Sequence, residues 1–184
     1  MHPVIVTLLS KLRCCPNDES VQEDAILALG FVLERSSRYD PQFNYANFIP
    51  ASLENYRLDV NEQESVVMAL LQLVESGLYT KSGVFWAIGK SQPEVIARYL
   101  SPFVVEHWKE LDVDALCAAL QSLINALFFS REQCVREISA LLRQGNLQKQ
   151  LLVIQQTFAS GSDVKVNSER LSAMIDHYGA QNGS

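Results

Sequence analysis

The sequence predicts an all-α protein built of stacked antiparallel helix hairpins. Apolar residues recur at helical spacing along most of the chain, and no segment shows the alternation typical of a β-strand. Capping residues and glycines separate the periodic segments, and most of the predicted connections are short. The composition agrees, since 184 residues with 48% hydrophobic and 20% charged side chains are typical of a globular chain that buries a sizeable core.

The first two helices are predicted from their start and stop signals. Pro3 suits the first turn of a helix, which ends before a turn at residues 15–18. Ser20 and Glu23 have the spacing of a capping box, so the second helix is predicted to begin there. Residues 37–60 then break the helical pattern with two prolines and a concentration of aromatic and acidic residues.

The rest of the chain is predicted to be a series of helices joined by short turns, which brings the total to about nine or ten. These helices are predicted over residues 61–77, 80–88, 93–111, 112–128, 130–144, 146–158 and 168–179. Asn61 with Glu64, Asn146 and Ser168 are expected as caps, and Pro102 is expected to kink or restart its helix. Residues 180–184 are expected to be a soft tail, and residues 1–184 a single domain.

The clearest pattern lies in residues 112–145, where two amphipathic stripes are separated by one or two residues. Asp112 stands at an N-cap position, Ser130 opens the second helix, and Gly145 stands at its C-terminus. Because the connection is so short, the two helices are predicted to fold back on each other as an αα-hairpin.

Three segments share a centre of small and apolar residues, and they lie at residues 25–30, 84–89 and, more loosely, 115–120. Their spacing follows no strict period. Helix pairs with such a centre resemble HEAT or armadillo-type repeats over residues 20–160, which implies an irregular α-solenoid with an extended surface. The break at residues 37–60 departs from a regular solenoid, so a compact irregular helical bundle is the alternative fold.

The charge of −6 argues against nucleic acid as a direct ligand, because phosphate binding needs a basic surface. Residues 17–64 hold ten acidic residues against three basic ones, whereas the rest of the chain is about neutral. This concentration is either a solvated helix face or an electronegative surface for a basic partner.

Motifs that carry chemistry are missing from the sequence. The four cysteines form no C-x-x-C pair, and the three histidines lack the spacing of a helical metal site. Gly-rich phosphate loops and the Gly-x-Ser-x-Gly motif are also missing, and the one Ser-x-x-Lys spacing, from Ser162 to Lys165, lacks its partner motifs and is taken as coincidence. We therefore expect no metal, no cofactor and no enzymatic activity. No apolar run reaches the roughly 18 residues of a membrane span and no secretory signal is evident, so we expect a cytoplasmic protein that does not bind membranes.

The remaining reading is a protein-binding module. Acidic residues steer a basic partner and tyrosines are favoured interface anchors. The candidate partner-binding residues are therefore Tyr39, Asp40, Tyr45, Phe48, Glu54, Tyr56, Asp59, Glu62 and Glu64. In size, charge and fold style the chain resembles the cytosolic immunity proteins of bacterial toxin systems. That resemblance implies a cognate basic toxin domain, for example a nuclease, whose active site is blocked by carboxylates in place of phosphates. A general helical-repeat adaptor or scaffold subunit is the alternative.

Overall fold

The computed structural model describes residues 1–15, 18–37, 56–77, 81–130 and 132–180. These residues form nine α-helices and no strand, which confirms the predicted all-α class in this part of the chain. The helices are α1 (Pro3–Cys14), α2 (Glu19–Ser37), α3 (Val60–Glu75), α4 (Lys81–Ile88), α5 (Pro93–His107), α6 (Val113–Phe128), α7 (Glu132–Gln144), α8 (Leu147–Thr157) and α9 (Asp163–Ala180).

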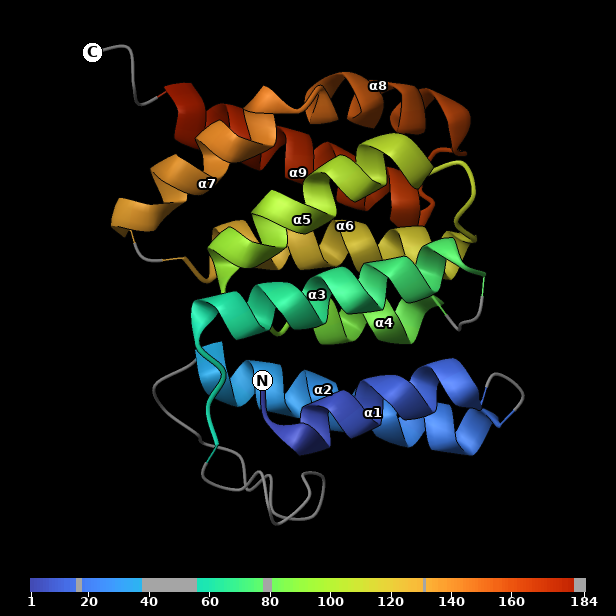
Figure 1. Ribbon diagram of the computed structural model, residues 1–184. Coiled ribbons are helices and arrows are strands. Elements are labelled where there is room, and N and C mark those ends of the chain that lie inside the picture. Colours follow the sequence, from blue (N-terminus) through green and yellow to red (C-terminus); the bar gives the residue numbers. More distant parts are fainter. Residues whose placement is uncertain (16–17, 38–55, 78–80, 131, 181–184) are drawn as a thin grey trace.

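The helices lie in two layers (Figure 1). In one layer α2, α4, α6 and α9 contact one another in succession, and in the other α1, α3 and α5 do the same. Each helix of the second layer packs on one of the first: α1 on α2, α3 on α4, and α5 on α6. The three segments with a small-residue centre fall on α2, α4 and α6, so the similar stretches of sequence lie on neighbouring helices.

The small residues of these segments allow α2, α4 and α6 to approach closely. A Cβ atom built on Gly30 of α2 would overlap the ring of Trp86 in α4, with Cη2 only 3.0 Å away. A Cβ atom on Gly89, just after α4, would lie 3.0 Å from the Cβ atom of Ser122 in α6. The Ser122 hydroxyl donates a hydrogen bond to the carbonyl oxygen of Phe85, at 2.9 Å, so it also links α6 to α4.

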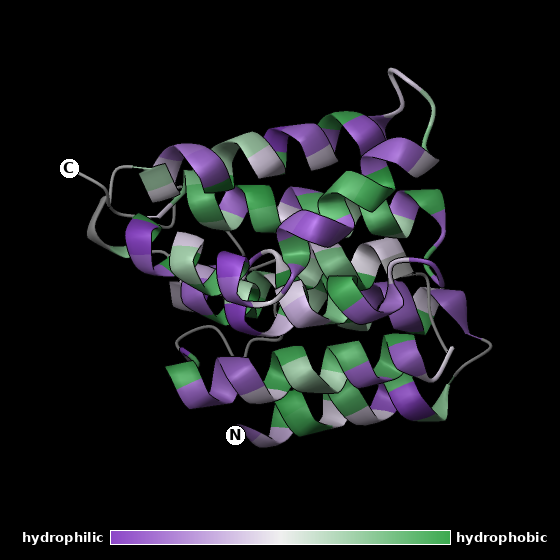
Figure 2. Cartoon of the chain, turned by 90° about the horizontal axis from the view of Figure 1, so that it is seen from above, coloured by the Kyte–Doolittle hydropathy of each residue, from purple (hydrophilic) through white to green (hydrophobic). Residues whose placement is uncertain are grey.

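The buried side chains form one cluster that extends from Ile5 in α1 to Ile175 in α9. Figure 2 shows hydrophobic and hydrophilic residues alternating along the helices, as expected of amphipathic helices that each bury one face. Within the described ranges no helix combines the length and the apolar character needed to cross a membrane. The indole of Trp108, at the end of α5, is buried and donates to Gln150 of α8 at 3.1 Å.

The C-terminal helices pack around the end of the layers, where α7 contacts α5 and α9 (Figure 1). Arg143 of α7 donates to the carbonyl oxygen of Ile175 at 3.1 Å and to that of Asp176 at 3.4 Å. The guanidinium lies directly against Gly179, where a Cβ atom would overlap it. The α6–α7 connection is short, but α6 has more extensive contacts with α4, α5 and α9, so the αα-hairpin predicted for residues 112–145 stays a prediction.

Several helix starts differ from those predicted. The cap of α6 is confirmed, since Asp112 accepts from the Ala115 amide at 2.7 Å. At α2 the capping carboxylate is that of Asp18, one residue before the helix, which accepts a hydrogen bond from the Val21 amide. The predicted cap, Ser20, lies inside the helix. At α3 the capping box is formed by Asp59 and Glu62. These two residues have the same spacing as the predicted pair, Asn61 and Glu64, and lie two residues earlier.

The later helix boundaries were also partly wrong. α9 begins at Asp163, so Ser168 is a buried residue within the helix rather than its cap. Asn146 precedes α8 with φ 60° and makes no side-chain cap; this left-handed conformation, which asparagine tolerates, turns the chain between α7 and α8. α5 contains Pro102 within its span, so the helix does not restart there, and the expected kink stays a prediction.

The irregular segment predicted at residues 37–60 is shorter at both ends, since α2 includes Ser37 and α3 includes Val60. Residues 38–55 lie outside the described part of the chain. The predicted tail also begins later, because α9 includes Ala180, and residues 181–184 lie outside the described ranges.

Candidate functional site

The predicted partner-binding residues divide into two groups. Tyr39, Asp40, Tyr45, Phe48 and Glu54 lie outside the described residues, so their prediction is untested. Tyr56, Asp59, Glu62 and Glu64 lie in the first turns of α3 and just before it.

Three of the described candidates contact one another at the start of α3. The Tyr56 hydroxyl donates to Glu62 Oε1 at 2.5 Å, and the α-amino group of Met1 lies 3.0 Å from the same oxygen. Asp59 Oδ1 accepts from the Glu62 amide at 2.8 Å, and the Asp59 amide donates to Glu62 Oε2 at 3.3 Å. The carboxylate of Glu62 therefore has its oxygens occupied by contacts within the protein.

The electrostatics of this cluster follow from the same contacts. The hydrogen bond from Tyr56 lowers the pKa of Glu62, against the opposing effect of burial, and the α-amino group of Met1 lowers it further. The same hydrogen bond raises the pKa of Tyr56, and burial adds to that shift. Glu62 is thus held as a carboxylate and Tyr56 as a phenol, which indicates a structural role at the start of α3.

Glu64, the fourth described candidate, connects α3 to α5. Its Oε1 lies 2.5 Å from Nη1 of Arg98, in an ion pair between the two helices. Burial raises the pKa of the neighbouring Tyr99, and a hydrogen bond to Glu64 raises it further while Arg98 opposes both. Glu64 is therefore also used within the protein, and it marks one end of the α3–α5 contact.

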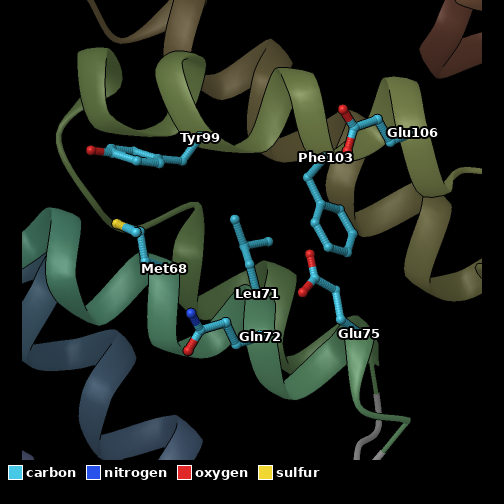
Figure 3. Close-up of a pocket in the computed structure, with 7 residues that line it drawn as sticks. All are labelled: Met68, Leu71, Gln72, Glu75, Tyr99, Phe103 and Glu106. Atoms are coloured by element: carbon cyan, nitrogen blue, oxygen red, sulfur yellow. The ribbon is translucent and has the colours of Figure 1, made fainter.

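An open groove of about 230 Å³ lies between α3 and α5 (Figure 3). It is lined by Met68, Leu71, Gln72 and Glu75 from α3 and by Tyr99, Phe103 and Glu106 from α5. We call these seven residues the α3–α5 groove. Figure 3 shows Leu71 pointing into the space between the two helices, with Tyr99 and Phe103 reaching it from the opposite side.

Helix periodicity explains why these side chains share one groove. Positions 68, 71, 72 and 75 recur at intervals of three and four, and positions 99, 103 and 106 do the same, so each set lies along one face of its helix. The Glu64–Arg98 pair joins the early parts of α3 and α5, and Glu75 approaches His107 at their ends. The two helices therefore run in the same direction, which brings Glu75 and Glu106 to the same end of the groove.

The middle of the groove is apolar and one end is acidic. Leu71 and Phe103 are buried in its floor, whereas the Met68 side chain is 45% exposed at its edge. At the acidic end the side chains of Glu75 and Glu106 are 48% and 71% exposed. Their carboxylates are therefore open to a partner, in contrast to those of Glu62 and Glu64.

His107 lies behind the acidic end. Its Nε2 is 3.7 Å from Glu75 Oε1 and 3.8 Å from Glu106 Oε2, and its Nδ1 is 3.2 Å from Glu110 Oε2. The imidazole ring also packs on Phe103, with the ring centroids 4.7 Å apart. These contacts place one nitrogen within reach of carboxylates from both helices. In the part of the chain that the structure describes, no three His, Cys, Asp or Glu side chains are arranged to hold a metal ion.

The groove was not predicted from the sequence, because no sequence pattern marks its residues as neighbours. Glu75, Glu106 and Tyr99 are spaced too far apart in the sequence to be recognised as neighbours, and each fits the ordinary solvated face of a helix. Their proximity depends on α3 packing beside α5, which periodicity alone does not specify.

No family model, curated protein or solved structure matches this chain. Function is therefore inferred from the chain's own surface.

Proposed function

We propose that this chain is a protein-binding module that takes a basic partner on the surface formed by α3 and α5. The observation that supports the proposal is the α3–α5 groove, whose apolar floor ends at the exposed carboxylates of Glu75 and Glu106. None of its seven lining residues is basic. An apolar surface beside exposed carboxylates suits a partner that brings both an apolar contact and positive charge.

The arrangement of helix pairs supports a stacked-hairpin architecture of the HEAT or armadillo type. The pairs α1 with α2, α3 with α4, and α5 with α6 follow one another in space as they do in the sequence. Stacks of this kind present extended surfaces made of equivalent helices, and α3 and α5 are such neighbours. The partner would then lie along the layer formed by α1, α3 and α5.

The partner we favour is a basic toxin domain, with the chain acting as a cytoplasmic immunity protein. In that case the carboxylates of the groove would occupy a surface that otherwise binds phosphates, and would block the active site of a domain such as a nuclease. The overall charge of −6 supports a basic partner, whether it is a toxin domain or another protein. The alternative is a general adaptor or scaffold subunit that binds a basic segment without inhibiting anything.

The proposal is tested by capturing the partner from the native host with tagged protein and identifying it by mass spectrometry. Association is then measured with the variant Glu75→Lys/Glu106→Lys. We expect about tenfold slower association at low salt and a weaker dependence on salt, because steering by the carboxylates is reversed. The matched control is Glu137→Lys/Glu169→Lys, which makes the same charge change at exposed positions on α7 and α9.

Three outcomes would contradict the proposal: a captured partner that is acidic, association that is unchanged in the groove variant, or association that is equally slowed in the control and the groove variant. Measuring the activity of the captured partner distinguishes the immunity hypothesis from the adaptor hypothesis. An immunity protein abolishes the toxicity of its captured partner in cells, whereas an adaptor leaves the partner's activity in place.

A further inference from the structure

We infer that the α3–α5 groove holds a single arginine side chain of the partner. This inference rests on the proposed function, since it assumes that the partner binds at this surface. It goes further by naming the group that is recognised and the residues that recognise it.

The size of the groove favours one side chain over a small-molecule ligand. Its volume of about 230 Å³ lies below the roughly 300–1,000 Å³ of pockets that enclose drug-sized ligands or cofactors. The groove is also open to solvent, so it suits a chain segment that crosses the surface and inserts one long side chain.

The apolar part of the groove matches the methylene stem of a long cationic side chain. Leu71 and Phe103 form a buried floor, and Met68 and Tyr99 flank it from opposite helices (Figure 3). Lysine and arginine both bury such stems along apolar surface while the charged end stays in a polar environment. The flexible thioether of Met68 can adapt to the stem.

The acidic end favours a guanidinium over an ammonium group. Glu75 and Glu106 come from different helices, and oxygens of both lie within 3.8 Å of one nitrogen, Nε2 of His107. A planar guanidinium offers five donors and can bind two carboxylates at once, whereas an ammonium is a compact, strongly hydrated charge. The aromatic ring of Phe103, which lies next to the acidic end in Figure 3, adds a surface on which a guanidinium can stack.

The test uses three blocked tripeptides, Gly-Arg-Gly, Gly-Lys-Gly and Gly-citrulline-Gly, titrated into the ¹⁵N-labelled full chain. We expect saturable shifts of amide signals in α3 and α5 around Leu71, Glu75 and Phe103 with the arginine peptide. Citrulline keeps the shape of arginine without its charge, so its affinity should be about tenfold lower, because neutral hydrogen bonds replace charge-assisted ones. The lysine peptide should bind more weakly than the arginine peptide.

Variants locate the binding site. Glu75→Gln/Glu106→Gln should weaken arginine binding about tenfold, because it removes both charged acceptors while keeping the shape of the side chains. The control Glu137→Gln/Glu169→Gln, at exposed sites on other helices, should bind like the original chain. The amide spectrum of each variant shows directly whether it is folded.

The inference is overturned if no saturable shift occurs, if the shifts map elsewhere, or if citrulline or lysine binds as well as arginine. Its failure is distinguishable from failure of the proposed function. A captured basic partner that responds to Glu75→Lys/Glu106→Lys, with no binding of the arginine peptide, removes only the arginine assignment. A partner that ignores those substitutions, with the peptide bound in the groove, removes the proposed binding surface and keeps the pocket.

Discussion

The contact between Gly30 of α2 and Trp86 of α4 predicts that Gly30→Ala destabilises the protein. Alanine normally stabilises a helix interior by about 1 kcal/mol relative to glycine. Here the new Cβ atom would overlap the indole ring of Trp86. That ring is already held by neighbours: its centroid lies 5.7 Å from the ring centroid of Phe31 and 5.1 Å from Nζ of Lys90. Overpacking costs up to about 3 kcal/mol, so we expect a net loss of about 2 kcal/mol.

The loss is measured as the free energy of unfolding in urea, followed by circular dichroism, and as a fall in Tm of about 4–8 °C for a chain of this size. Gly83→Ala is the matched control in α4. Its Cβ atom would lie 3.7 Å from Cγ2 of Ile26, which is ordinary contact. We therefore expect Gly83→Ala to stabilise the protein by about 0.5–1 kcal/mol.

A double-mutant cycle identifies the cause. If overlap with the indole is responsible, Gly30→Ala should be neutral or stabilising in a Trp86→Ala background, where the ring is gone. The reasoning is refuted if Gly30→Ala stabilises the original chain, or if its cost is unchanged without the indole.

Two further predictions concern hydrogen bonds at helix ends. Tyr56→Phe should lower the free energy of unfolding by about 1.5 kcal/mol at neutral pH, because Glu62 loses its phenol donor. The hydrogen bond from Tyr56 lowers the pKa of Glu62 in the folded protein. The bond therefore stabilises the protein at pH values above the pKa that Glu62 has in the unfolded chain. This stabilisation is lost as the pH falls through the pKa of Glu62 in the folded protein. Urea unfolding at neutral and acidic pH should show the difference shrinking in acid, and a difference that does not change would contradict the assignment. Gly179→Ala should cost about 1–2 kcal/mol by displacing the guanidinium of Arg143 from the carbonyl groups of Ile175 and Asp176 in α9. Its effect on urea unfolding should be largely absent in an Arg143→Ala background, and full additivity of the two losses would argue against the displacement.

The sequence was sufficient to predict the helices but not all of their starts. The apolar stripes reflect burial on one face, which depends mainly on the local pattern, so the all-α class followed from them. Caps are less specific, because several acceptors near a helix start have suitable spacing. Asp18 and Asp59 accept in place of Ser20 and Asn61, each within two residues of the predicted position.

The candidate site was harder to predict for a physical reason. Acidic residues near α3 were correctly noted, but Glu62 and Glu64 make their contacts within the protein, to Tyr56 and Arg98. Their availability depends on neighbours that only folding brings close. The accessible carboxylates in the groove come from two helices whose adjacency is a tertiary property, and no local pattern encodes it.

The two tryptophans of the chain lie at different junctions, and this has a practical consequence. Trp86 is half-buried between α2 and α4 beside the cation of Lys90, whereas Trp108 is buried and joins α5 to α8. Each indole therefore lies at a different helix junction. In a variant that keeps only one of the two tryptophans, fluorescence follows loosening at that junction alone, without an attached dye.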